Sequence, residues 1–354
     1  MRNPFRRDLV LLQNLTWKQP NGEVVVNPLT FVPCDLDYVD VPAYRYLLRS
    51  LFKYRSLRNL VPHLEWLHDP VTLLLTARGC TENCSVCGGS RSAYRLICER
   101  DRPALRSPEK LVEDVRVIST FSRAPIFVVH DPRMGGLPRA TRFFSLLERM
   151  GTQNEMVFEL YYPAGAGFFE LVSRSVRTWS IEITLESPDE ALRRRNGKFP
   201  WSNAVVEETI QEALAHGCRT LDVFFMTGLP GQRYEDALAI ADYCEHLLDR
   251  FGADGRLHPF VAPLGPFLDP GSRAFEQPQF GYRTFCRTLE DHRLAFLLNG
   301  DELKWPVQHR FRIGTTLLRN LAAGLALEIH HTVARLAGRY DVAPAHATRR
   351  VERA

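Results

Sequence analysis

The sequence has no long hydrophobic run. Its most apolar late stretch, residues 321–327, lies between Arg319 and Glu328 and is far shorter than the ~20 residues that a membrane-spanning helix needs. The apolar run behind the basic N-terminus covers only residues 9–12, which is too short for a secretory signal peptide. No fixed-period repeat or low-complexity tract is visible. We therefore expect a cytoplasmic protein that does not enter a membrane.

A dominant charge is lacking as well. The net charge is +4 over 354 residues, and the hydrophobic and charged fractions of 45% and 24% are those of an ordinary globular protein. The densest basic groups, residues 193–195 and 349–350, are short, so nucleic acid is not expected as a partner. The length allows one large domain or two modest ones with a sizeable core.

Three of the eight cysteines, Cys80, Cys84 and Cys87, lie within eight residues of each other. A disulfide framework is not expected in a chain of this length without a secretory signal. Structural zinc ordinarily takes four ligands in pairs, and the nearest fourth candidate, Cys98, belongs to no pair. A cubane iron–sulfur cluster ordinarily takes four cysteines, so three on one loop leave one iron open to a small molecule. The spacing favours a [4Fe–4S] cluster, with zinc or chance clustering as alternatives.

From residue 71 onward, apolar β-branched runs alternate with amphipathic helical patterns. This alternation predicts parallel βαβ units. Six units in ~200 residues fit a partial (β/α)6 TIM-like barrel rather than the complete eight-stranded form. The cysteine loop then lies at the C-terminal end of the first strand, where such barrels carry their chemistry. The predicted strands are residues 71–76, 125–130, 156–161, 179–185, 220–226 and 258–262, and the predicted helices begin near 107, 139, 203 and 235.

The segments on either side of the predicted barrel have a different pattern. We divide the chain into an N-terminal arm (1–65), a core barrel (66–275) and a helical C-terminal extension (276–354). Within the arm, residues 16–27 predict a hairpin with an Asn-Gly turn, and residues 43–54 predict a helix. In the extension, apolar residues recur at helical spacing between Leu317 and Leu336.

Polar residues follow several of the predicted strands. The fourth strand ends in Glu186 and Ser187, with Arg193 soon after, and the fifth ends in a turn at Gly228. A carboxylate at the C-terminal end of a barrel strand points into the site, although Glu186 is also placed to cap the next helix. Other candidates are as often loop anchors as site residues. They are His130, Asp131, Arg133, Glu159, Tyr161, Tyr162, Asp269 and Ser272.

The cysteine loop resembles that of the radical S-adenosylmethionine (SAM) enzymes. In that family the open iron of a [4Fe–4S] cluster chelates the amino and carboxylate groups of SAM, and an electron from the cluster releases a 5′-deoxyadenosyl radical. The resemblance covers residues 66–275. It implies that Cys80, Cys84 and Cys87 hold the cluster, and that Glu186, Ser187, Arg193 and Gly228 contribute to cofactor binding. The chain departs from the family by lacking an aromatic residue directly before Cys87, which leaves adenine recognition unassigned.

The flanks resemble a narrower group, the cobalamin-binding radical SAM proteins. The resemblance lies in residues 14–22 and 35–37 before the barrel, and in residues 268–272 and 288–293 near its end. Only ~70 residues precede the barrel, about half of what a doubly wound nucleotide-type domain needs. The D-x-H-x-x-G motif that marks cobalamin binding does not occur. Either cobalamin is not used, or a separate cobalamin-binding protein supplies it.

The resemblance predicts a radical SAM enzyme acting on an unidentified substrate, with an electron donor such as flavodoxin or ferredoxin. Two alternatives stay open. The chain is the catalytic subunit of a cobalamin-dependent methyltransferase whose cobalamin is supplied in trans, or it is a non-catalytic iron–sulfur or zinc scaffold. Failure to cleave SAM with metal bound would favour the scaffold, and co-purification with a cobalamin protein would favour the methyltransferase.

Overall fold

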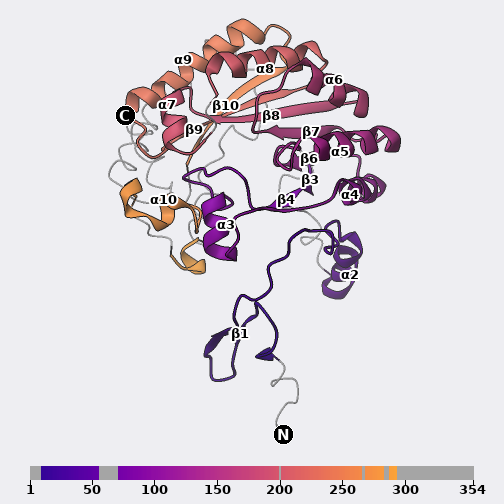
Figure 1. The fold of residues 1–354 in the computed structure, drawn as a ribbon, viewed down its shortest axis with the longest axis vertical. Helices are drawn as coiled ribbons and strands as arrows, with labels where there is room; N and C mark the ends of the chain where they lie inside the picture. Colours follow the sequence, from indigo (N-terminus) through magenta and orange to yellow (C-terminus); the bar gives the residue numbers. More distant parts are fainter. Residues whose placement is uncertain (1–8, 56–70, 199–200, 265–267, 283–286, 293–354) are drawn as a thin grey trace.

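Six parallel strands form the main sheet of the computed structural model, which describes residues 9–55, 71–198, 201–264, 268–282 and 287–292 (Figure 1). The spatial order β10-β9-β8-β7-β6-β3 follows the chain order, and every neighbouring pair is parallel. This is the predicted partial (β/α)6 barrel. The strands are β3 (Thr72–Leu75), β6 (Ile126–Val129), β7 (Met156–Leu160), β8 (Trp179–Glu186), β9 (Leu221–Thr227) and β10 (Leu257–Pro263).

Helices connect successive strands and cover one face of the sheet (Figure 1). The strand residues on that face are large, apolar and buried, and they form one hydrophobic core with the helices. Residues on the other, inner face are mostly half-buried. The helices of this layer are α4 (Pro108–Phe121), α5 (Leu137–Met150), α6 (Ala166–Ser175), α8 (Asn203–Ala215) and α9 (Tyr234–Phe251). Two shorter helices between strands, α3 (Arg91–Cys98) and α7 (Glu190–Arg195), have their buried residues outside this core.

Local signals explain where several helices begin. The Ser107 side chain accepts a hydrogen bond from the Lys110 amide, with Pro108 at the first helical position, as the sequence predicts for α4. Ser90 and Ser202 cap α3 and α8 in the same way. The sequence prediction omitted α3, α6 and α7, and also a short antiparallel pair that follows β3. That pair is β4 (Ala77–Arg78) with β5 (Ala104–Leu105).

The N-terminal arm contains the predicted hairpin and helix. Strands β1 (Thr16–Lys18) and β2 (Val24–Val26) pair across a turn that contains Gly22 at φ +88°, and α2 (Tyr44–Tyr54) follows. Figure 1 shows the hairpin projecting away from the barrel, joined to it by an extended segment. The stated division of the chain at residues 65 and 275 stays a prediction.

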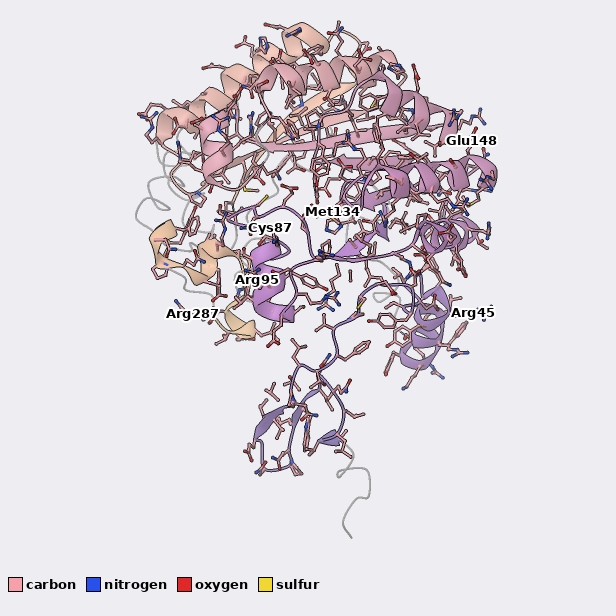
Figure 2. All side chains as sticks on the ribbon, in the orientation of Figure 1. Arg45, Cys87, Arg95, Met134, Glu148 and Arg287 are labelled. Atoms are coloured by element: carbon pink, nitrogen blue, oxygen red, sulfur yellow. The ribbon has the colours of Figure 1, made fainter. Side chains whose placement is uncertain are left out.

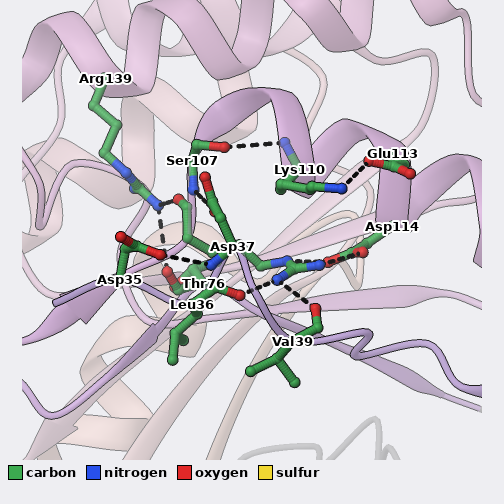
Figure 3. Close-up of polar contacts among 11 residues, drawn as sticks. Asp35, Leu36, Asp37, Val39, Thr76, Ser107, Lys110, Glu113, Asp114 and Arg139 are labelled. Carbon is green, nitrogen blue, oxygen red and sulfur yellow. Dashed lines mark hydrogen bonds and ion pairs between the residues drawn. The ribbon is translucent and has the colours of Figure 1, made fainter. Parts of the chain in front are cut away.

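A buried ion pair attaches this extended segment to the barrel (Figure 3). The Arg106 guanidinium donates to the Asp114 carboxylate on α4, at 2.8 Å for one of two contacts, and both side chains are almost fully buried. The same guanidinium donates to the Leu36 and Val39 carbonyls of the arm. Asp37 accepts from the Ser107 amide at 2.8 Å. The arm is therefore held where α4 begins, close to the end of β3.

After β10 the described chain contains α10 (Arg273–Glu276) and the 3-10 turn η3 (Pro278–Phe280). Most of the predicted helical extension, including residues 317–336, lies outside the described residues. Among the helices that the structure describes, none is long and apolar enough to cross a membrane.

Candidate functional site

The cysteine loop follows β3 and β4 at the C-terminal ends of the barrel strands. Cys80 and Cys84 are buried and Cys87 is half-buried; Figure 2 labels Cys87, which lies next to α3. Two loop amides face the sulfur atoms, because Glu82 N–H donates to Cys80 Sγ and Gly89 N–H donates to Cys87 Sγ, both at 3.3 Å. N–H···S hydrogen bonds of this kind stabilise thiolates that bind a metal cluster.

The turn after α7 packs directly on this loop. Asn196 accepts two hydrogen bonds from Ser85, at 2.7 Å from its amide and 2.6 Å from its hydroxyl. The Cys84 Sγ–H group donates to the Gly197 carbonyl at 3.8 Å, across 113 residues of sequence. Gly197 has a φ of +72° and approaches the Asn83 carbonyl so closely that a Cβ would lie 2.2 Å from its oxygen. The loop and this turn therefore form one tightly packed unit.

The segment after β10 also contacts the loop. The Asp269 carboxylate accepts from the Gly88 amide at 3.0 Å, and the Ala274 amide donates to the Ser85 carbonyl at 2.8 Å. Ser272, the second candidate in this segment, caps α10 instead of facing the loop. Asp269 is thus a residue that positions the cysteine loop.

The donor set fits a cluster better than a zinc ion. Burial raises the pKa of the Cys80 thiol to about 11 and of the Cys84 thiol to about 12, so a bound metal must displace their protons. Structural zinc ordinarily takes four protein ligands, and the loop offers three thiols. A cubane takes each thiolate on a different iron, which three separate sulfurs on one loop allow.

Beside the loop lies a buried ion pair between Glu186 and Lys198. The Lys198 Nζ atom is 2.9 Å from Glu186 Oε1, and each side chain is 7% exposed. Glu186 ends β8 at a register shift and has a φ of +67°, which is strained for a residue with a side chain. Burial alone would lower the pKa of Lys198, but Glu186 and the neighbouring Cys84 raise it overall. Lys198 is therefore a buried cation.

The other predicted cofactor-binding residues make local contacts in this structure. The Ser187 hydroxyl accepts from the Asp189 amide. The Arg193 guanidinium is buried and donates to the Ser187 and Trp201 carbonyls and to the Asn203 side chain. Gly228, at φ +91°, donates its amide to Gln232 at 2.6 Å. The Arg193 guanidinium thus stabilises the turn after Glu186, and Lys198 is the described cation that pairs with the Glu186 carboxylate.

Comparison with known families agrees with this geometry. Residues 74–244 match the Radical SAM superfamily. The chain carries a radical SAM domain. No match was found among curated proteins.

Among solved structures, similarity extends to three radical SAM enzymes of different kinds. One is the methyltransferase TsrM from Kitasatospora setae with tryptophan and aza-SAM bound (TM-score 0.48, 13% identity, 67% of this chain and 41% of that chain). The others are the cobalamin-dependent enzyme OxsB with aqua-cobalamin bound (0.45, 15%, 76% and 36%) and coproporphyrinogen III oxidase HemN from Escherichia coli (0.41, 12%, 58% and 47%). This chain thus spans less than half the length of each.

In the radical SAM domain, the residues that follow β6 and β7 hold neighbouring loops together. The Asp131 carboxylate pairs with Arg133 at 2.6 Å and accepts from the Tyr161 and Tyr162 amides. The Tyr162 hydroxyl donates to Glu82 of the cysteine loop at 2.9 Å. These residues therefore join the loops around the cysteine segment, and a direct part of any of them in binding stays a prediction.

The inner face of the barrel carries a row of four ionisable side chains, of which the sequence analysis named only Glu159 as a candidate. Glu159, Glu182, Asp222 and His258 occupy paired positions on β7, β8, β9 and β10. His258 Nδ1 lies 3.2 Å from the Asp222 carboxylate. Burial, together with the charges of Glu159 and Asp222, raises the pKa of Glu182 to about 7. Each residue alternates with buried apolar neighbours along its strand, which is the signal that places it on the inner face.

We expect Glu182→Gln to stabilise the protein at high pH. The pKa of Glu182 is raised in the folded state, so wild-type stability is unaffected below the unfolded pKa of about 4.5, falls between about pH 4.5 and 7, and stays at the lower value above pH 7. The two pKa values differ by about 2.5, so at about 1.4 kcal/mol per pKa unit the variant should gain about 3 to 4 kcal/mol above pH 7 and little near pH 5. Urea unfolding between pH 5 and 8 measures this difference. Glu208→Gln, at an exposed position on α8, should show no such trend, and a pH-independent Glu182→Gln effect would contradict the assignment.

We expect Gly197→Ala to displace the cysteine loop. A Cβ at this residue meets the Asn83 backbone, which cannot yield as a flexible side chain would. Gly151 is the matched control, because its φ of +66° is similar but no atom lies within 4 Å of its would-be Cβ. Both variants should lose about 1 kcal/mol of stability from backbone strain, but only Gly197→Ala should lose most of its bound iron after reconstitution. Equal iron content in the two would contradict the close packing.

Proposed function

We propose that this protein is a radical SAM enzyme that cleaves SAM reductively and acts on a substrate with the resulting radical. The observation that carries the proposal is the buried cysteine loop of a radical SAM domain, packed against the Glu186–Lys198 pair. When bound, a [4Fe–4S] cluster supplies the electron that cleaves the sulfonium of SAM. The protein's own task is to hold three thiolates, orient the cofactor and exclude water.

Cys80, Cys84 and Cys87 are the residues that would hold the cluster. Their loop is fixed by contacts that need no cysteine proton, from Ser85 to Asn196, from Gly88 to Asp269 and from Tyr162 to Glu82. The loop therefore needs little rearrangement to bind, which favours the cluster because the ordering cost is met on folding.

Glu186 and Lys198 supply opposite charges for the amino-acid part of SAM. The Glu186 carboxylate suits the cofactor ammonium, and the Lys198 ammonium suits the cofactor carboxylate. We assign binding of the cofactor carboxylate to Lys198 in place of Arg193, because the Arg193 guanidinium donates hydrogen bonds to Ser187, Trp201 and Asn203. Ser187 and Gly228 shape the turns at the ends of β8 and β9 from which the cofactor is approached.

The substrate would lie against the inner face of the barrel. The row from Glu159 on β7 to His258 on β10 gives that face ionisable groups able to orient a polar substrate. The electron would come from a donor such as flavodoxin or ferredoxin. Use of cobalamin from a separate protein stays a prediction from the sequence.

The test is an assay for 5′-deoxyadenosine and methionine after anaerobic reconstitution with iron and sulfide. With SAM and dithionite we expect the two products in equal amounts, and none when dithionite is left out. Product that forms only on addition of hydroxocobalamin would favour the cobalamin-dependent alternative. A complete cluster with no product under any of these conditions would contradict the proposal and favour a non-catalytic scaffold.

A further inference from the structure

Both the backbone and the ammonium group of Lys198 are held by contacts. Its backbone amide donates to the Arg193 carbonyl at 2.9 Å, which closes the C-terminal end of α7. The preceding residue, Gly197, accepts from Cys84 Sγ and lies in close contact with the Asn83 backbone. The ammonium group is fixed by Glu186 at 2.9 Å, and it lies 6.0 Å from the centre of the Tyr161 ring. The cation is therefore fixed at the wall of the cysteine loop.

Cys84 is the loop cysteine that lies closest to the turn bearing this charge. Its Sγ atom is 3.8 Å from the carbonyl of Gly197, the residue directly before Lys198. The Lys198 ammonium and the Glu186 carboxylate are 2.9 Å apart, and both side chains are buried. Two buried charges of opposite sign thus lie beside the place where three thiolates would gather.

We propose that the charge of Lys198 raises the reduction potential of the cluster that the neighbouring cysteine loop would hold. The proposal rests on the proposed function, since it requires the cluster to be present. Reduction adds one negative charge to a cluster that already carries three thiolates. A buried cation favours the more negative state, because Coulomb interactions are strong where water is excluded. Net charge and exposure are among the factors that set cluster potentials.

Glu186 limits this effect by pairing with Lys198. The pair is nearly neutral as a unit, but its two ends are not equivalent, because Lys198 is attached to the turn that contacts Cys84. Removing the ammonium leaves a buried carboxylate beside the loop and disfavours reduction. Removing the carboxylate charge leaves the ammonium alone and favours reduction. The two changes therefore move the potential in opposite directions, which a general loss of packing would not do.

The test is potentiometric titration of the reconstituted cluster in the absence of SAM, followed by electron paramagnetic resonance. Lys198→Met should make the reduction potential of the cluster at least about 59 mV more negative. At a fixed applied potential, the ratio of reduced to oxidised cluster then falls at least tenfold. Lys198→Arg keeps the charge, so its ratio of reduced to oxidised cluster should stay within threefold of the wild-type ratio. Glu186→Gln should shift the ratio toward the reduced form. Lys110→Met, at an exposed ion pair on α4, should leave it unchanged.

Shifts of opposite sign in Lys198→Met and Glu186→Gln would support the proposal. Shifts in the same direction, or a Lys198→Met potential equal to that of Lys110→Met, would overturn it. If Lys198→Met takes up no iron, the test rests on Glu186→Gln. A reduction potential above that of the wild type supports the proposal, and an unchanged or lower one overturns it. The readout needs no SAM cleavage. A failure here is therefore distinct from a failure of the proposed function, which appears in the deoxyadenosine assay.

Discussion

Cys84→Ala should abolish cluster binding and, with it, the formation of 5′-deoxyadenosine that we propose for this protein. Three thiolates bind three irons of a cubane and leave the fourth iron open. The loss of any one of them removes a ligand that we expect no neighbouring side chain to replace. Cys84 is the member of the set that is bonded to the turn carrying Lys198. We expect iron and sulfide content after reconstitution to fall to background, and product to fall by at least a thousandfold. Metal analysis and the product assay on the same sample measure both.

Cys98→Ala is the matched control for this variant. Cys98 is also buried and is the nearest cysteine in sequence, but it lies at the end of α3. It should keep full iron content and activity. If Cys98→Ala loses its metal as Cys84→Ala does, four cysteines hold the metal. The open coordination site, and the chemistry that depends on it, would then be excluded.

Asp114→Ala has the largest expected effect on stability. It leaves the Arg106 guanidinium buried without its carboxylate, and breaking one half of a buried pair costs about 3–5 kcal/mol. The same guanidinium bonds the Leu36 and Val39 carbonyls, so the arm should also become more accessible to protease near those residues. Urea unfolding and limited proteolysis measure the two effects.

Glu113→Ala provides a control on the same helix. Glu113 pairs with Lys110 at 2.7 Å on the exposed side of α4, as Figure 3 shows. Exposed pairs contribute at most about 1 kcal/mol. A double variant, Arg106→Met with Asp114→Leu, should recover much of the stability that Asp114→Ala loses, because no unpaired charge remains. Equal losses in Asp114→Ala and Glu113→Ala would contradict the importance of the buried pair.

The barrel could be predicted from the sequence because each strand is a short apolar run next to an amphipathic helix. Parallel strands buried on one face need such runs, and successive units must pack side by side. All six predicted strands are confirmed within two residues at each end. Helices α3 and α6 were not predicted. α3 is only eight residues long and α6 only ten, so neither gives a long periodic pattern.

The candidate site was only partly predictable. The cysteines and Glu186 stand out because their chemistry depends on short spacing or on the end of a strand. Lys198 does not stand out, because Asn196-Gly197 indicates only a turn and nothing local shows that the turn packs on a loop 113 residues earlier. Arg193 has the same charge and lies nearer to Glu186 in sequence. Only the tertiary contacts show that it is bonded elsewhere.

The most direct test of the central claim is whether SAM binds to the cluster itself. Electron paramagnetic resonance of the dithionite-reduced, reconstituted protein, recorded with and without SAM, measures this. We predict a [4Fe–4S]⁺ signal whose shape changes when SAM is added, because the open iron gains the amino and carboxylate ligands of SAM. A cluster signal that SAM leaves unchanged, or no cluster signal at all, would contradict the account.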